Sequence, residues 1–413
     1  MIAQPIPQKT SGFLCISSKF TTMKASLGLP LLAAALLLAG AQQQASATTY
    51  SWVNNSGSGT GTAPNGYWNS ITHWNSGTVV PVSDVDTVIS FTGISQNAVT
   101  TNDLGAMTLN RLVMQTSVGG TKALSIAGNS FNFVQNSSNV LPTLLLQNRG
   151  TSAITLSAPF TVTDALTITN SGTTTAGTTI SGAITNTGGI TFDGTGTNTI
   201  TLGGGTMSGA GGLTHNGSYR INVTGTKSYT GSTTISNGTL GLGVNLTATS
   251  SVIVNGGTLT SSVANVNLGV GAVSMSTGGI DIRGAAAAGT FTLAANQAFT
   301  TTGGTLSFDL IDSISFDQVI GSGSGTFSLT DTTLALSGLT SIAGTYQLFT
   351  GFGGTNSVSG LTITGLDSGF TGSLDTTGLL TIAAIPEPST YAMLAGVLAL
   401  GMGVWRRTRG RSV

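Results

Sequence analysis

The chain has 413 residues, 60 of which are glycine, and only 6% of its residues are charged. Glycine without a G-X-Y period and with few prolines excludes collagen, and the many β-branched residues exclude an ordinary disordered chain. Between residues 48 and 385 there are six lysines and arginines against twelve aspartates, which excludes a basic nucleic-acid-binding patch. The single cysteine, Cys15, precedes the first apolar run, so a disulfide framework is also excluded.

The first segment, residues 1–47, predicts a signal peptide. Lys24 precedes a run rich in Leu and Ala, and Ala45 and Ala47 supply the small-x-small pattern of a cleavage site. We expect cleavage after Ala47, because the apolar run is short for a permanent membrane anchor. Met23, which directly precedes Lys24, is an alternative to Met1 as the first residue of the translated protein.

Residues 48–142 are expected to form an N-terminal β module with aromatic residues gathered near its start. Trp52, Trp68 and Trp74 lie in this short region. Flat aromatic faces pack well on pyranose rings, so one interpretation is a glycan-stacking surface. The other, which we favour, is an aromatic cap that closes the open end of a stacked fold, since such stacks need a capped end for solubility.

Residues 143–284 carry short β-prone runs separated by Gly, Asn and Ser. Short strands with alternating apolar positions, joined by Gly-rich turns, predict an all-β fold, a right-handed parallel β-helix or β-solenoid. A β-sandwich gives similar local signals and is the alternative fold. The apolar markers of the repeat follow one another at a nearly constant short spacing, at Leu156, Ile168, Ile180, Phe192, Leu202 and Leu213.

Residues 228–243 are the most regular part of this region. Their characteristic positions are Tyr229, Gly231, Thr233, Ile235, Gly238, Thr239, Leu240 and Leu242. In these positions the segment resembles the autotransporter-associated β-strand repeat, which implies a surface-exposed β-helical scaffold and no chemistry. Ile235, Leu240 and Leu242 should point inward, and Gly238 should make the turn between two strands. The chain beyond is too short for further repeats and a translocator barrel, so self-transport across an outer membrane is not expected.

Residues 285–385 carry longer alternating runs, which predict a C-terminal β subdomain of antiparallel strands or the last coils of the stack. The runs cover residues 305–311, 325–329, 333–337, 345–350, 361–364 and 379–382.

Residues 386–413 begin with Pro386-Glu387-Pro388, where Glu387 is the one glutamate of the chain. Seventeen uncharged residues follow, over 389–405, and at 1.5 Å each they predict a single transmembrane helix of about 25 Å. The positive-inside rule then holds the C-terminus in the cytoplasm. The arginines that would act in this way are Arg406, Arg407, Arg409 and Arg411.

This order of proline-rich motif, apolar helix and arginine cluster resembles the PEP-CTERM sorting signal. The resemblance implies an exosortase-type membrane protease as partner. Such a protease recognises the Pro386-Glu387-Pro388 motif and releases an inner-membrane-anchored precursor to the cell surface or extracellular matrix. The two prolines favour the extended backbone that a peptidase can grip. A plain single-pass anchor with a proline-rich stalk is the alternative.

Candidate chemistry is sparse in the exported region. Asp309, Asp312 and Asp317 could supply the two carboxylates of a glycosidase, but their spacing gives no common strand face, and aspartates beside Ser and Gly commonly form turns. His73 and His215 lie far apart without metal-ligand spacing. We therefore predict no catalytic residue, no metal and no cofactor.

These observations predict a non-catalytic exported structural or adhesion protein of the cell surface or extracellular matrix. The alternative is a carbohydrate-binding or polysaccharide-active β-helix protein. Exopolysaccharide is the macromolecular partner that fits both, and nucleic acid is not expected as a partner.

Overall fold

The architecture comes from a computed structural model of the chain. It describes residues 47–53, 66–75, 77–94, 98–119, 121–284, 287–338, 343–386 and 388–409.

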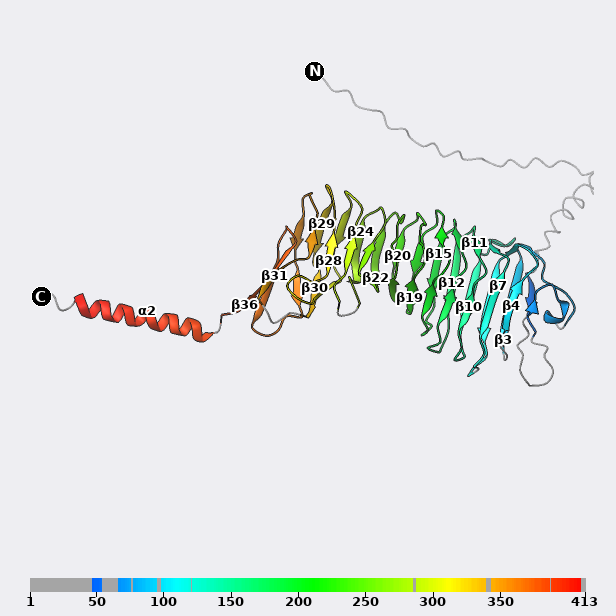
Figure 1. The fold of residues 1–413 in the computed structure, drawn as a ribbon, viewed down its shortest axis with the longest axis horizontal. Coiled ribbons are helices and arrows are strands. Elements are labelled where there is room, and N and C mark those ends of the chain that lie inside the picture. The colour runs from blue at the N-terminus through cyan, green and yellow to red at the C-terminus, as the bar shows by residue number, and fades with distance from the viewer. Residues whose placement is uncertain are drawn as a thin grey trace, which may run out of the picture. The chain divides into compact units, whose positions relative to one another are not determined.

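The described chain forms a parallel β-solenoid, with a three-stranded antiparallel sheet and one helix near its C-terminal end (Figure 1). Most strands belong to a single 24-stranded sheet whose strand pairs are parallel. The all-β prediction is confirmed, and the parallel stack rather than the β-sandwich is the architecture, because sandwich sheets are built from antiparallel strands.

Each coil of the solenoid places strands on up to three faces, which we call the first, second and third face. The first face contains β1 (Thr48–Ser51), β3 (Thr87–Ile94), β6 (Arg111–Thr116), β9 (Thr143–Gln147), β12 (Leu166–Asn170), β15 (Ile190–Asp193), β18 (Leu213–His215), β20 (Thr233–Ile235), β26 (Ala298–Thr301), β29 (Thr326–Thr330) and β33 (Ser357–Ser359).

The second face contains β2 (Gly66–Tyr67), β4 (Ala98–Asn102), β7 (Leu124–Gly128), β10 (Ile154–Leu156), β13 (Thr178–Ile180), β16 (Ile200–Leu202), β19 (Arg220–Val223), β21 (Thr239–Leu242), β27 (Thr305–Leu310), β30 (Thr333–Gly338) and β34 (Thr362–Thr364). Two long strands, β22 (Val252–Ser261) and β24 (Val273–Asp281), run through both faces, since β22 pairs with β20 and also with β21.

The third face is made of short strands in two separate ladders. They are β5 (Met107–Leu109), β8 (Phe131–Phe133), β11 (Phe160–Val162), β14 (Ile184–Asn186), β17 (Met207–Ser208), β23 (Asn265–Asn267), β25 (Thr290–Thr292), β28 (Gln318–Ile320) and β32 (Phe349–Thr350).

The strand register shows that the spacing between successive apolar markers is half of a coil. Ile168 pairs with Phe192, and Phe192 pairs with His215, all on the first face. Leu156 pairs with Ile180 on the second face. Successive markers therefore alternate between two faces, and one complete coil runs from Ile168 to its partner Phe192.

The core is built by the inward position of each strand. In β12, Leu166 and Ile168 are buried, whereas Thr167 and Thr169, which alternate with them, are half-buried. The same alternation recurs from coil to coil, so apolar side chains stack in columns along the solenoid. Complete burial of such a side chain stabilises the fold by about 1.5–3 kcal/mol.

The parallel ladder runs continuously through the module boundaries expected from the sequence. β6 pairs with β9 across the boundary at 142 and 143, and β24 pairs with β27 across the boundary at 284 and 285. Antiparallel pairing is confined to a sheet of β31 (Gly344–Gln347), β36 (Leu379–Ala384) and β35 (Phe370–Leu374). Residues 285–385 therefore contain both the last coils and a small antiparallel sheet.

Helix α2 (Pro388–Arg409) occupies the place where a helix was expected. In the part of the chain that the structure describes, however, no helix is long and apolar enough to cross a membrane, so the span predicted over residues 389–405 is not found there.

Candidate functional site

The aromatic residues of the N-terminal module form one buried cluster. Trp52 is 3% exposed, and Trp68 and Trp74 are fully buried. The ring centroid of Trp52 lies 5.0 Å from that of Trp74, and Trp68 lies 5.2 Å from Trp74. Phe91 and Phe131 of the following coils pack against this cluster, with Phe131 at 5.5 Å from Trp68.

These positions correct the glycan-stacking interpretation of the three tryptophans. Their faces are covered by one another, by His73, which stacks on Trp52 at 4.7 Å, and by phenylalanines of the core. The Trp74 Nε1–H donates to the Trp68 carbonyl at 2.8 Å, which fixes the orientation of the ring. The cluster packs on the buried side chains Phe91 and Phe131 of the first coils, so it covers the N-terminal part of the core as a cap would.

The repeat motif is placed as its pattern indicates. Ile235, Leu240 and Leu242 point inward and are at most 1% exposed, which confirms that prediction. Gly238 lies between β20 and β21 with φ of +61°, a conformation that L side chains rarely adopt. A Cβ at Gly238 would also collide with the carbonyl oxygen of Tyr219.

The remaining motif residues also have structural positions. The Tyr229 hydroxyl forms a hydrogen bond of 2.6 Å with the Thr233 hydroxyl, and both side chains are buried. A Cβ at Gly231 would collide with the backbone of the preceding coil, and Thr239 begins β21 half-buried. The motif therefore builds a coil and gathers no reactive group.

Two polar residues occupy inward columns, which the sequence pattern did not indicate. His215 is fully buried in the column after Phe192, and its Nε2 lies 2.9 Å from the Tyr219 carbonyl oxygen. Its Nδ1 has no hydrogen-bond partner among the described residues, and burial lowers its pKa. Lys227 bridges Met207 and Leu246 on the third face and is 3% exposed.

The three aspartates considered for catalysis do not share a site. The Asp312 carboxylate accepts hydrogen bonds from the backbone of Ile314 and Ser315, so it forms a turn. Asp317 is fully buried and accepts backbone hydrogen bonds from Gly289 at 2.7 Å and from Asp309 at 2.9 Å.

Asp309 instead lines a shallow groove of about 360 Å³ on the outward side of the second face, which we call the outer-face groove. Asp281 and Arg283, one coil earlier, line the same groove, and the Ser337 hydroxyl donates to the Asp309 carboxylate. Burial and the nearby Asp309 raise the pKa of Asp281. Sequence reasoning missed Asp281 and Arg283. They alternate with the apolar Ile280 and Ile282, and this alternation places both on the outward side of the chain.

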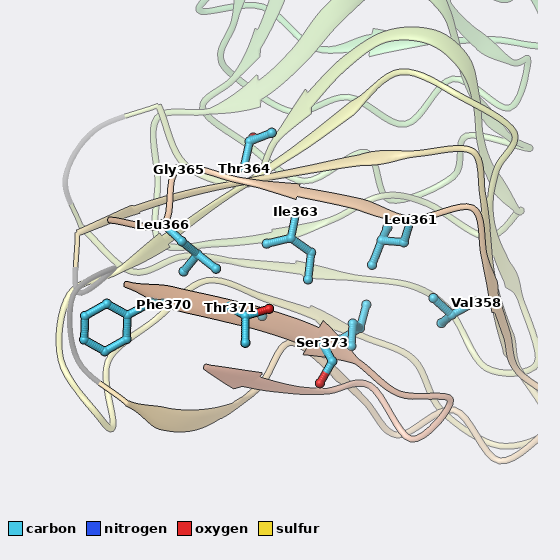
Figure 2. A pocket seen from close by; sticks show the side chains of 11 residues that line it. Val358, Leu361, Ile363, Thr364, Gly365, Leu366, Phe370, Thr371 and Ser373 are labelled. Atoms are coloured by element: carbon cyan, nitrogen blue, oxygen red, sulfur yellow. The ribbon is translucent and has the colours of Figure 1, made fainter. Parts of the chain in front are cut away.

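A second groove, of about 510 Å³, lies at the C-terminal end of the stack, between β34 and β35 (Figure 2). Leu361, Ile363 and Leu366 point into it. Ile363 continues the column of Leu334, which is fully buried one coil earlier, but is itself only half-buried. The antiparallel sheet thus covers this end of the solenoid incompletely. We call this feature the C-terminal groove.

The sorting residues lie only in part within the described chain. Pro386 is exposed, Glu387 lies outside the described residues, and Pro388 begins α2. Arg406 and Arg407 are exposed near the end of α2, which closes at Arg409. Outside the described residues lie Arg411, Ala45 and most of the predicted signal peptide.

The predicted cleavage site adjoins the first strand. Ala47 is exposed, and β1 begins at the next residue, Thr48, whose N–H donates to the Asp86 carbonyl at 3.1 Å. Cleavage after Ala47 would therefore leave the whole of β1 in the mature chain.

Among the described residues, no group of three or more His, Cys, Asp or Glu side chains could hold a metal ion. Comparison with protein families, with curated proteins and with solved structures finds no match to this chain.

Proposed function

We propose that the chain is a non-catalytic structural or adhesion protein of the cell surface or extracellular matrix, which acts through the outer surface of its solenoid. The observation that carries this proposal is a row of outward threonines on the first face. Thr167 pairs with Thr191, Thr191 with Thr214, and Thr214 with Thr234. Neighbouring strands are about 4.7–4.9 Å apart, so the row repeats at that interval.

Such a row suits contact with a hydroxyl-rich polymer. Threonine hydroxyls both donate and accept hydrogen bonds, and they keep the face hydrated without charge. A second row runs through Thr155, Thr179 and Thr201 on the second face. Exopolysaccharide presents hydroxyls in a repeating pattern, which makes it the partner class that we infer.

The proposal is tested with the purified chain and a panel of polysaccharides. We expect retention on at least one polymer without release of reducing ends. The double change Thr191→Ala and Thr214→Ala should weaken retention, whereas Thr161→Ala with Thr185→Ala, an outward pair on the third face, is the matched control. Release of reducing ends would contradict the non-catalytic assignment, and absence of retention would contradict adhesion.

The outer-face groove supports a second candidate, a polysaccharide-active protein. Asp281 and Asp309 line this one groove, and burial together with the charge of Asp309 raises the pKa of Asp281, as a general acid requires. If the panel reveals turnover, Asp281→Asn should abolish it, while Asp312→Asn, at an exposed turn, should not.

We also propose export, with residues 1–47 as signal peptide, and sorting through the C-terminal tail by an exosortase-type protease at the membrane. The exposed position of Pro386 next to α2 supports access by a protease. We further propose that the coils of the solenoid are right-handed, because connections between parallel strands of one sheet are right-handed in about 98% of cases.

Sorting is tested in a host that contains such a protease. The variant Glu387→Ala should remain associated with cells, whereas Asp367→Ala, at an exposed acid of the C-terminal β region, should be released like the original chain. Equal release of both variants would contradict the proposed tag.

A further inference from the structure

The C-terminal groove exposes apolar side chains at the last coil of the stack, beside the hydroxyl-bearing Thr371 and Ser373. Val358 continues the column of Leu329, which is fully buried, yet Val358 is half-buried. Figure 2 shows Leu361 and Ile363 directed into the groove, whereas the side chain of Thr364, next to Ile363 in β34, points away from them. Water-exposed apolar side chains in a concave site favour occupation by another apolar group.

Helix α2 carries an apolar surface of matching character that is open to solvent. Met393, Leu394, Val397 and Leu398 are each at least 60% exposed. These side chains lie in the uncharged part of α2, and the side chains directed into the groove are also uncharged. A soluble helix normally buries such a surface against a partner.

The two surfaces are joined by a very short piece of chain. β36 pairs with β35 as far as Phe370 and Ala384, and Phe370 lines the groove. The Ile385 N–H then donates to the Gly369 carbonyl at 2.7 Å, which fixes the chain at the groove's rim. From Ile385 to Pro388 the chain can span at most about 11 Å.

We propose that α2 docks its first turns into the C-terminal groove and closes the open end of the solenoid. Met393 and Leu394 lie about 8–9 Å along the helix from Pro388, at 1.5 Å per residue, which brings them within reach of the groove. A short tether raises the effective concentration of α2 to about the millimolar range, which favours this helix over a free partner. A groove of about 510 Å³ has room for a few large side chains rather than the whole helix.

The consequence for the molecule rests on the proposed sorting function. Cleavage near Pro386–Pro388 would separate α2 from the solenoid, so the docked helix would protect the apolar end until processing. The docking itself requires no protease, and its test is therefore independent of the test at Glu387.

The chain offers a direct test because Cys15 is its single cysteine. In the full chain with Cys15→Ser, the pair Leu366→Cys and Leu394→Cys should form an intramolecular disulfide under mild oxidation. The matched control is Thr191→Cys with Leu394→Cys, whose first cysteine lies on the outer surface of the first face. We expect the groove pair to form at least about tenfold faster, as the effective concentration implies. Mass spectrometry of the non-reduced peptides measures both rates.

A charge in the groove provides the second measurement. Leu361→Asp, added to the groove pair, should slow the disulfide at least about fivefold because it places a carboxylate in the apolar contact. Thr362→Asp, at an exposed position of β34 that does not line the groove, should leave the rate unchanged. Equal rates for groove and control pairs would overturn the proposal. Disulfides only between molecules, increasing with protein concentration, would also overturn it in favour of a second copy as occupant.

Discussion

At the scale of single residues, the least expected feature is a lysine inside the solenoid. Lys227 occupies an inward position between Met207 and Leu246, and its Nζ donates to the Thr224 carbonyl at 2.6 Å. Burial lowers the pKa of Lys227 to about 8. In the unfolded chain the pKa of lysine is about 10.4, so above pH 8 the unfolded state binds the proton more tightly than the folded state does.

We therefore expect the free energy of unfolding to rise from pH 8 to pH 9.5, by up to about 2 kcal/mol. Lys227→Met should remove this rise, and Lys122→Met should retain it. Urea denaturation at both pH values measures the difference, and the range stops at pH 9.5 because unfolded tyrosines titrate near 10. Parallel pH profiles for the original chain and Lys227→Met would contradict the assignment.

Asp317 predicts the opposite slope at lower pH. Burial raises its pKa to about 7, although the N–H groups of Gly289 and Asp309 donate to its carboxylate. Between pH 5 and pH 7 the folded state holds a proton that the unfolded state, with a pKa near 3.9, has lost. The free energy of unfolding should therefore fall as the pH rises through this range.

The expected fall is about 2 kcal/mol from pH 5 to pH 7, and the raised pKa of Asp281 acts in the same direction. Asp317→Asn should flatten the profile, while Asp312→Asn should not. Thermal or urea unfolding at the two pH values is sufficient. An unchanged slope in Asp317→Asn would show that this carboxyl is already ionised in the folded protein at pH 5.

At the scale of the element, the turn between β20 and β21 is the best-defined feature of the repeat. Gly238 has φ of +61°, and a Cβ there would collide with the carbonyl oxygens of Tyr219 and Gly217. Gly105 is a matched control, because its φ is +93° but a Cβ there would meet nothing within 4 Å. Gly105→Ala thus isolates the backbone strain, about 1–2 kcal/mol.

We expect Gly238→Ala to lower the free energy of unfolding by more than Gly105→Ala does, since it adds the collision with the neighbouring coil. Equilibrium urea unfolding of the two variants gives the comparison. Equal losses of unfolding free energy would mean that the coils separate locally to accept the methyl group. The close approach at Gly238 would then not contribute to the need for glycine.

The elements also mark where sequence reasoning succeeds and where it does not. The strands around Ile168 and Ile180 could be predicted because inward apolar and outward threonine residues alternate along each of them. The third face could not, because β17 is only two residues long and Lys227 takes an inward place on the same face. Such short pieces have no periodicity to detect.

The outer-face groove was missed for a different reason. Asp281 and Asp309 are distant in the sequence, and they meet only because β24 pairs with β27 in one register. The pattern of one sequence identifies residues that are neighbours along a strand. To identify residues that are neighbours in successive coils, the length of a coil must also be known. The marker spacing gave half of that length, so cross-coil neighbours could not be assigned from it.

At the scale of the whole molecule, the solenoid is a linear stack in which each coil contacts mainly the coils before and after it. Stability in such folds is approximately a sum of coil and neighbour terms. The register makes Phe192 and His215 equivalent positions in successive coils. A deletion of residues 192–214 therefore removes one complete coil and joins strands of the same face.

We expect the chain lacking residues 192–214 to fold, with a β-rich circular dichroism spectrum and a cooperative urea transition at somewhat lower denaturant concentration. Deletion of residues 192–203 is the matched control, because it removes half a coil and shifts every later strand to another face. That variant should lose its cooperative transition or aggregate, since inward columns would no longer align. If both deletions fold equally well, the strand register is not what determines the stack, and the coil length inferred from Ile168 and Phe192 is wrong.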